Sequence, residues 1–139
     1  MSDRGRSEAS RWLRQAQVDL GWAQHLLEEG AYYLVCFLSQ QAAEKALEAF
    51  LYWQGEEVVL GHSVRQLCEK AAGYDESFAG NCPRWGILDT YYILTRYPNG
   101  LPDGTPAETY DEVSGREALS LAKQIVNHVA SRTGLAADA

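Results

Sequence analysis

The sequence predicts an all-α protein, an up-and-down bundle of about five helices without a significant β-sheet. Apolar residues recur at steps of three and four along most of the chain, and glycine or proline separates the segments that carry them. No window alternates apolar and polar residues over the length of a strand. The 139 residues suffice for one domain, which at this size buries roughly 68–70% of its unfolded surface.

The two longest helical patterns are adjacent in the sequence. Residues 9–29 carry an apolar face at the helical step, formed by Leu13, Ala16, Leu20, Ala23 and Leu27. Residues 31–54 contain no glycine or proline, and their apolar face consists of Val35, Leu38, Ala42, Ala46, Ala49 and Trp53. Only Gly30 separates the two patterns, so we expect a long antiparallel hairpin of two helices.

Two shorter helices are predicted next. Ser63 is placed to cap the first of them, which we expect to end near Gly73. Pro83 suits the first turn of the second, and Pro98 disfavours a helical residue before it, so this helix should end at Tyr97. The faces expected to be buried are Leu67, Cys68 and Ala71 in the first helix and Ile87, Leu88, Tyr91 and Leu94 in the second.

Glycine and proline punctuate residues 99–114, which predicts an exposed loop before a last helix. Ser114 is expected to cap that helix, whose apolar face is Ala118, Ala122, Ile125 and Val129. We therefore divide the chain into a flexible N-terminus at 1–8, a single helical domain at 9–132 and a flexible tail at 133–139.

Charge and cysteine content narrow the classes of function. Twelve Lys and Arg against 19 Asp and Glu give a formal charge of −7, which argues against an extended nucleic-acid surface but permits a small local site. Cys36, Cys68 and Cys82 are odd in number and lack metal-ligand spacing, so we expect no metal, no cofactor and no disulfide framework. Without an apolar run long enough for a membrane span or a signal peptide, the chain is expected to be cytoplasmic.

A polar stripe on the second helix is the most informative local feature. Gln41, Glu44, Lys45 and Glu48 recur at i, i+3, i+4 and i+7, which places them on one face opposite the apolar face. One interpretation is a solvated face that keeps the helix soluble. The other is a binding surface, because small alanines beside the stripe allow a ligand or another helix to approach closely.

Two further features have both a structural and a functional interpretation. His62 precedes a helix, where a histidine is commonly a loop or capping residue, and no Ser or Cys partner stands at a diagnostic spacing. Arg96 and Tyr97 end the helix that carries Tyr91 and Tyr92. An arginine there neutralises the negative end of the helix, but a guanidinium beside a phenol also suits phosphate contact and base stacking.

Together these residues resemble the HEPN family of nucleotide-binding helical domains. The resemblance rests on Ala16-x-x-Asp19-Leu20, the tract from Gln40 to Leu47, His62 before the third helix, and Thr95-Arg96-Tyr97-Pro98 after paired tyrosines. It covers roughly residues 9–131 and is closest to the compact stand-alone branch, often encoded beside a minimal nucleotidyltransferase in a toxin-antitoxin-like module.

The resemblance implies a homodimer with a nucleotide ligand in a groove near the dimer contact. Gln41, Glu44 and Lys45 would line that groove, with His62, Arg96 and Tyr97 at its edge. Lys45 and Arg96 could hold phosphate, Tyr97 could stack on a base, and Gln41 could donate and accept hydrogen bonds. The expected function is therefore that of a nucleotide-binding accessory protein, with a nucleotidyltransferase as its partner.

Two alternatives remain open at this point. Many members of the family are ribonucleases in which four to six residues separate an Arg from a following His, and no Arg here has a His at that spacing. A metal-independent ribonuclease would have to use an atypical catalytic pair, His62 with Arg96, brought together by the fold. The third possibility is a structural homodimer without a ligand, in which the polar stripe is a solvated face.

Overall fold

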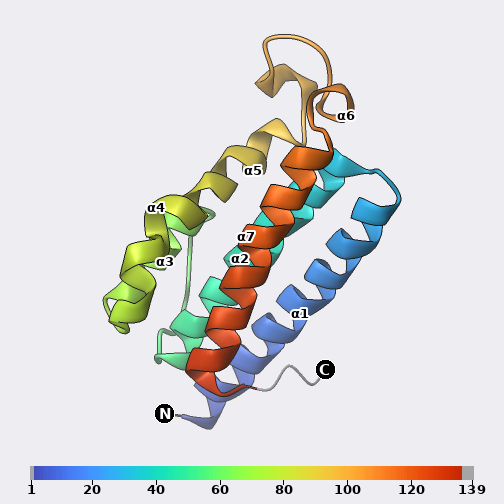
Figure 1. The fold of residues 1–139 in the computed structure, drawn as a ribbon. Helices are drawn as coiled ribbons and strands as arrows, with labels where there is room; N and C mark the ends of the chain where they lie inside the picture. The colour runs from blue at the N-terminus through green and yellow to red at the C-terminus, as the bar shows by residue number, and fades with distance from the viewer. Residues whose placement is uncertain (1, 136–139) are drawn as a thin grey trace.

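The computed structural model describes residues 2–135, and within that range every regular element is helical. Three long helices lie side by side, α1 (Asp3–Glu28), α2 (Tyr32–Trp53) and α7 (Glu112–Thr133), and a layer of short helices covers one side of them (Figure 1). The predicted all-α class and the absence of strands from residues 2–135 are both confirmed.

The predicted hairpin of α1 and α2 is confirmed. Gly30 takes a left-handed φ of 78°, which turns the chain between the two helices within a few residues (Figure 1). Small residues let the two helices pack closely: Ala16 of α1 and Ala42 and Ala46 of α2 are fully buried. Helix α2 lies between α1 and α7, so most of its surface is inside the protein.

Helix α1 begins earlier than the apolar periodicity predicts. We expected a flexible segment up to residue 8, but residues 3–8 are helical and continuous with the rest of α1. The Ser2 hydroxyl accepts a hydrogen bond from the Gly5 N–H at 3.0 Å and so caps the first turn. An N-cap supplies the start of a helix even where no apolar face is present to indicate it.

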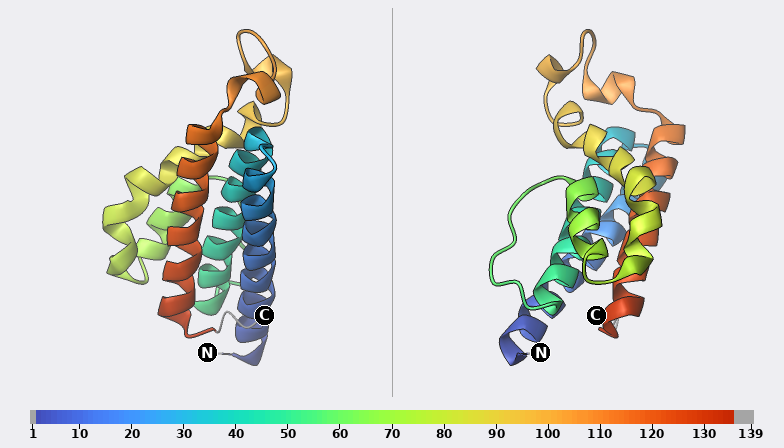
Figure 2. Two further views of the ribbon diagram at one scale, coloured as in Figure 1. Left: turned by 45° about the vertical axis from the view of Figure 1, so that its right-hand side comes forward. Right: turned by 90° about the vertical axis from the view of Figure 1, so that its left-hand side faces the viewer.

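An irregular loop over residues 54–63 joins α2 to the layer of short helices over residues 64–94, which we call the covering layer. It bows away from the bundle, as the right-hand view of Figure 2 shows. Gly55 and Gly61 take left-handed φ angles of 102° and 112°, and Val59 is its buried anchor, with its N–H bonded to the Tyr52 hydroxyl at 3.4 Å. The far end of this loop delivers His62.

Helix α3 (Val64–Ala72) matches the prediction, and Ser63 caps it by accepting a hydrogen bond from the Gln66 N–H at 3.1 Å. A distant carboxylate completes the cap. Asp89 accepts from the Val64 N–H at 2.6 Å and from the Ser63 hydroxyl at 2.8 Å. The start of α3 is thereby tied to the segment that follows it in the covering layer.

The continuous helix predicted for residues 83–97 is wrong. The segment alternates 3₁₀ and α turns: η1 (Glu76–Asn81), α4 (Cys82–Trp85), η2 (Gly86–Thr90) and α5 (Tyr91–Leu94). A 3₁₀ helix has three residues per turn, so Trp85, Leu88 and Tyr91 share one buried face. Ile87, which an α-helix would bury with them, is 39% exposed.

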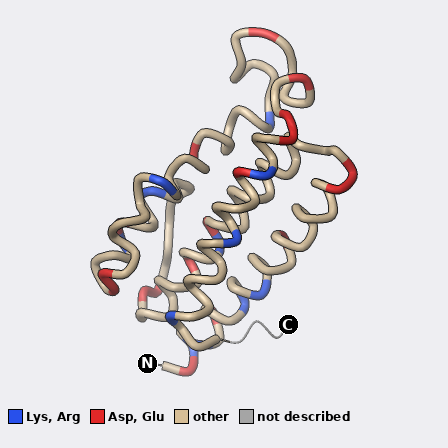
Figure 3. Tube along the Cα trace, viewed as in Figure 1, with Lys and Arg blue, Asp and Glu red and all other residues tan. Residues whose placement is uncertain are grey.

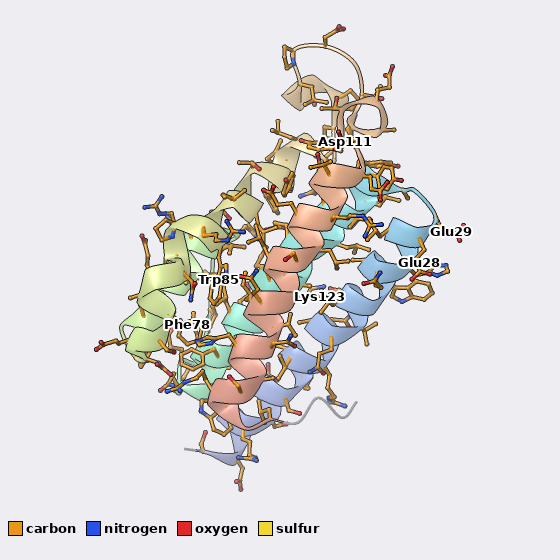
Figure 4. The ribbon with its side chains drawn as sticks, viewed as in Figure 1. Glu28, Glu29, Phe78, Trp85, Asp111 and Lys123 are labelled. Atoms are coloured by element: carbon orange, nitrogen blue, oxygen red, sulfur yellow. The ribbon has the colours of Figure 1, made fainter. Side chains whose placement is uncertain are left out.

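Side chains of this covering layer complete the core against α7. Phe78 and Trp85 are buried and lie between the covering layer and α7 (Figure 4). The two rings are 6.4 Å apart in an edge-to-face arrangement, and the Trp85 indole N–H donates to Gln124 of α7 at 3.2 Å.

The predicted loop contains the short helices η3 (Pro98–Gly100) and α6 (Pro106–Thr109) and projects from one end of the bundle, where Figure 3 colours its acidic positions red. Ser114 is not the cap of the last helix. Asp111 is, because its carboxylate accepts from the Ser114 N–H at 3.0 Å. Helix α7 therefore starts at Glu112.

At the other end, α7 runs to Thr133, which the sequence prediction assigned to the tail. Gly134 ends the helix with a left-handed φ of 69°, and Leu135 is buried. Residues 136–139 of the predicted tail lie outside the described residues.

Candidate functional site

The polar stripe of α2 is largely buried. Glu44 is 6% exposed, Glu48 is 5% exposed, and neighbouring Gln40 is fully buried. Their spacing of four residues puts all three on one face of α2. A solvated face is therefore wrong for the carboxylates of this stripe, since buried carboxylates need hydrogen-bond or charge partners.

Glu44 is the centre of a hydrogen-bonded cluster. One carboxylate oxygen lies 2.8 Å from Nδ1 of His62, and the other accepts from the Gln40 amide at 3.0 Å. The Gln40 amide also donates to the His62 carbonyl at 3.3 Å, and its own oxygen accepts from Gln41 at 2.6 Å. The cluster thus contains three of the predicted site residues, Gln41, Glu44 and His62. Gln40 links them through its hydrogen bonds.

Glu48 lies one turn beyond Glu44 on the same buried face, and its pKa is strongly raised. Burial, and then the neighbouring negative charge of Glu44 and a hydrogen bond to it, raise the pKa of Glu48 to about 8, although Lys45 acts in the opposite direction. At neutral pH the Glu48 carboxyl therefore holds its proton and can donate it in a hydrogen bond to Glu44. The pair then buries one negative charge instead of two.

His62 projects from this cluster toward solvent. Its side chain is 64% exposed although Nδ1 is held by Glu44, and its ring stacks on Tyr92 at a centroid distance of 5.0 Å and an angle of 14°. A carboxylate on one ring nitrogen fixes the orientation of an imidazole and leaves the other nitrogen to exchange protons. Within residues 2–135 no hydrogen-bond partner engages Nε2.

Arg96 lies on the same tyrosine. Its guanidinium carbon is 5.1 Å from the Tyr92 ring centroid, 5.3 Å from that of Tyr97 and 5.7 Å from that of Phe37. Its Nη2 also donates to the Tyr97 hydroxyl at 3.3 Å. No carboxylate in the described part of the chain forms an ion pair with Arg96, so its charge is available at the surface.

Lys45 stands apart from this group, on the α1 side of α2. Its ammonium lies 2.6 Å from the Asp19 carboxylate, which also accepts from Gln15 at 3.0 Å. Lys45 lines an open hollow of about 390 Å³ with Glu8, Arg11, Trp12 and Gln15. Of the two predicted cations, Lys45 is neutralised by a partner on α1 and Arg96 is not.

The site thus contains residues that the sequence prediction left out. Tyr92 joins His62 to Arg96, Gln40 joins Gln41 to Glu44, and Asp19 holds Lys45. Asp19 carried a signal, because an acidic residue there interrupts the otherwise apolar inner face of α1. Tyr92 and Gln40 were noted only within the motifs that carry the resemblance, Tyr92 in the tyrosine pair and Gln40 at the start of the tract to Leu47, and neither was assigned a role at the site.

No group of three or more His, Cys, Asp or Glu side chains within residues 2–135 is arranged to hold a metal ion. None of the described helices is long and apolar enough to cross a membrane.

The comparison with known families decides what kind of domain this is. The sequence profile of the HEPN domain matches residues 9–132. The chain belongs to the HEPN family. A comparison with functionally curated proteins gives no match.

Two solved structures have the same fold. The sequence of TT1696 from Thermus thermophilus is 36% identical to this one. Its crystal structure matches with a TM-score of 0.76, and the match covers 90% of this chain and 98% of that one. The sequence of ST0689, an archaeal HEPN homologue, is 32% identical to this one. Its crystal structure matches with a TM-score of 0.69, and the match covers 91% of this chain and 98% of that one. The similarity spans nearly the whole of each protein.

Proposed function

We propose that this HEPN protein binds a nucleotide, or the end of a nucleic-acid strand, at the surface formed by His62, Tyr92, Arg96 and Tyr97. The observation that carries the proposal is the free guanidinium of Arg96, held among aromatic rings beside an exposed imidazole. A guanidinium suits the oxygens of a phosphate, and aromatic rings suit the face of a base.

Each residue has a defined part in this proposal. Arg96 contacts phosphate, and Tyr97, which is 48% exposed, stacks on the base. His62 and Gln41 supply hydrogen bonds, and Glu44 holds His62 in position. Lys45 would have to leave Asp19 before binding phosphate, so we assign it a supporting role between α1 and α2.

The charge of the whole chain is consistent with a confined site. With a formal charge of −7, the protein as a whole repels polyanions, and the proposed site has one arginine, Arg96, which suits a single phosphate group rather than a long strand. The proposal therefore favours small nucleotides and strand ends over duplexes.

A thermal-shift series tests the binding proposal, because a ligand that binds only the folded state raises the melting temperature. We expect ribonucleotides to raise the melting temperature of the wild type and to have no effect on Arg96→Gln. Arg116→Gln is the matched control, since Arg116 is exposed and pairs with Glu112 on α7, away from the site. Equal shifts in both variants would contradict the role of Arg96.

A metal-independent ribonuclease is the second candidate, favoured by the contact of Glu44 with His62 beside Arg96. A histidine oriented by a carboxylate can transfer protons, and a nearby guanidinium can stabilise the charge on a phosphate in the transition state. This candidate predicts RNA cleavage in the presence of a chelator, lost in His62→Ala. Binding of nucleotides without any cleavage would favour the accessory role.

We propose, in addition, that the protein forms a homodimer through the outer face of α1. Val18 and Trp22 on this face are 53% and 59% exposed, and no atom approaches the position of a Cβ on Gly21. Before this apolar pair α1 carries four arginines and two acidic residues, and Glu28 and Glu29 follow the pair. Two antiparallel copies of α1 would therefore place basic residues opposite acidic ones around an apolar centre.

The mass in solution tests the dimer. We expect a dimer at micromolar concentration for the wild type and a monomer for Trp22→Glu. Val113→Glu is the control, because Val113 is 72% exposed on a different helix, and this variant should stay dimeric. A dimer that binds no nucleotide would favour the structural role, whereas a monomeric wild type would contradict the interface.

The proposed macromolecular partner is a minimal nucleotidyltransferase, in a two-protein module of the toxin-antitoxin type. The acidic loop before α7, with Asp103, Glu108 and Asp111, offers a surface for a basic partner (Figure 3). Co-purification with a nucleotidyltransferase encoded beside this protein, weakened by neutralising these three residues, would support the pairing. Co-purification unaffected by the substitutions would exclude this loop as the contact.

A further inference from the structure

Two cysteines outside the candidate site lie against each other. The Sγ atoms of Cys68 in α3 and Cys82 in α4 are 2.7 Å apart. Non-bonded carbon atoms pack at roughly 3.5–4.0 Å, and sulfur is larger than carbon, so this is a very close approach. Both sulfurs also lie near the Phe78 carbonyl oxygen, at 3.5 Å and 3.4 Å, which holds them on the same side of η1.

We propose that Cys68 and Cys82 are an oxidation site, which forms an intramolecular disulfide on reaction with a small-molecule disulfide such as oxidised glutathione. The Cys82 thiolate attacks the small disulfide, forming a mixed disulfide and releasing one small thiol. The Cys68 thiolate then attacks the Cys82 sulfur and releases the second. The protein loses two protons and two electrons, and one small disulfide becomes two thiols.

The burial of the two thiols sets the order and the pace of these steps. Cys82 is 4% exposed and Cys68 is fully buried, so Cys82 is the one that a small molecule reaches first. Burial raises the pKa of the Cys68 thiol, which keeps it protonated and slows its attack. We therefore expect oxidation over minutes to hours, limited by local opening of the covering layer.

The position of the pair gives the disulfide a mechanical consequence. Helix α3 follows directly after His62, and the segment from α4 to α5 leads to Arg96. At one end these two segments are tied by the bonds from Asp89 to Ser63 and Val64. A disulfide between Cys68 and Cys82 would tie them a second time and restrict the motion of His62 relative to Arg96.

Cys36 provides an internal control. It is fully buried in α2, and burial, with smaller contributions from Asp111 and Glu117, raises its pKa to about 12. Neither of the other cysteines lies within hydrogen-bond distance of its sulfur in the described chain. It should stay reduced under conditions that oxidise the pair.

The test is incubation of the folded protein with excess oxidised glutathione, followed by alkylation in denaturant, intact mass and peptide mapping. We expect the wild type to lose two hydrogen masses, to take up one alkyl group in place of three, and to yield a peptide linked through Cys68 and Cys82. Cys36→Ser should form the same link, and Cys82→Ser should not. A persistent glutathione adduct, a link to Cys36, or three alkylated thiols would each overturn the proposal.

Discussion

Nδ1 of His62 lies 2.8 Å from a carboxylate oxygen of Glu44, which joins an exposed loop residue to the buried face of α2. Two bonds from Gln40, one to Glu44 and one to the His62 backbone, reinforce this relationship. The chemistry of the surface thus depends on a polar group inside the bundle.

The first prediction concerns Glu44 itself. Glu44→Ala should cost about 1–3 kcal/mol of unfolding free energy, because it leaves the buried Gln40 amide without one of its acceptors. The stacking of the His62 ring on Tyr92 should also weaken, because Glu44 no longer holds Nδ1 of His62 in place. Denaturant unfolding gives the first quantity, and the chemical shifts of the His62 ring give the second. Glu28→Ala, at the exposed end of α1, should stay within about 0.5 kcal/mol of the wild type.

Glu48 should make stability depend on pH. The unfolded chain releases this proton near pH 4.5, whereas the folded protein holds it to about pH 8. Between these values only the folded state binds the proton, so this contribution to stability is complete below pH 4.5 and is lost as the pH rises toward 8.

The isosteric substitution Glu48→Gln isolates that effect. The amide stays neutral and can still donate to Glu44, so the difference in unfolding free energy between the variant and the wild type should grow from pH 5 to pH 8. At pH 8 we expect the variant to be more stable by about 1–3 kcal/mol. A difference that does not change with pH would show that Glu48 is ionised in the folded protein.

The bond between Asp19 and Lys45 should couple α1 to α2. A double-mutant cycle with Asp19→Asn and Lys45→Met should give an interaction free energy of about 1–2 kcal/mol, because both groups are mostly buried. The exposed pair Arg65 and Glu69 is the reference, and its coupling should be much weaker. Equal coupling in the two cycles would mean that Lys45 is free to bind a ligand.

Asp89 should stabilise α3 across the covering layer. Asp89→Ala removes the acceptor for the Val64 N–H and the Ser63 hydroxyl, and we expect a loss of about 1–2 kcal/mol. Asp103→Ala, in the exposed loop before α7, serves as the control and should have little effect on the melting temperature. If both variants melt alike, the cap is supplied by Ser63 alone.

The sequence was most informative where one local signal decides the structure. Gly30 and Ser63 were placed correctly, because a turn with positive φ requires glycine and an N-cap requires a short polar side chain. The start of α7 shows the limit of such signals. Asp111 and Ser114 are three residues apart and both suit a cap, and the hydrogen bond runs from Ser114 to Asp111.

The interior of the site was less predictable because it depends on contacts between distant segments. Nothing along α2 distinguishes a buried Glu44 from a solvated one, since burial is decided by the loop that brings His62 over it. Asp89, in the 3₁₀ turn before Tyr92, likewise makes its contact with a distant segment, since it accepts from the Val64 N–H at the start of α3. The sequence therefore singles out these residues as candidates but does not indicate their surroundings.

The irregular loop over residues 54–63 has a consequence for the connectivity of the chain. His62 is held by Glu44 and stacks on Tyr92, so its position does not depend on an unbroken link to α2. The start of α1 and the end of α7 lie at the same end of the bundle (Figure 1). A circular permutant that joins those ends and opens the chain near Glu57 would keep every contact of the site while changing the order in which its parts are synthesised.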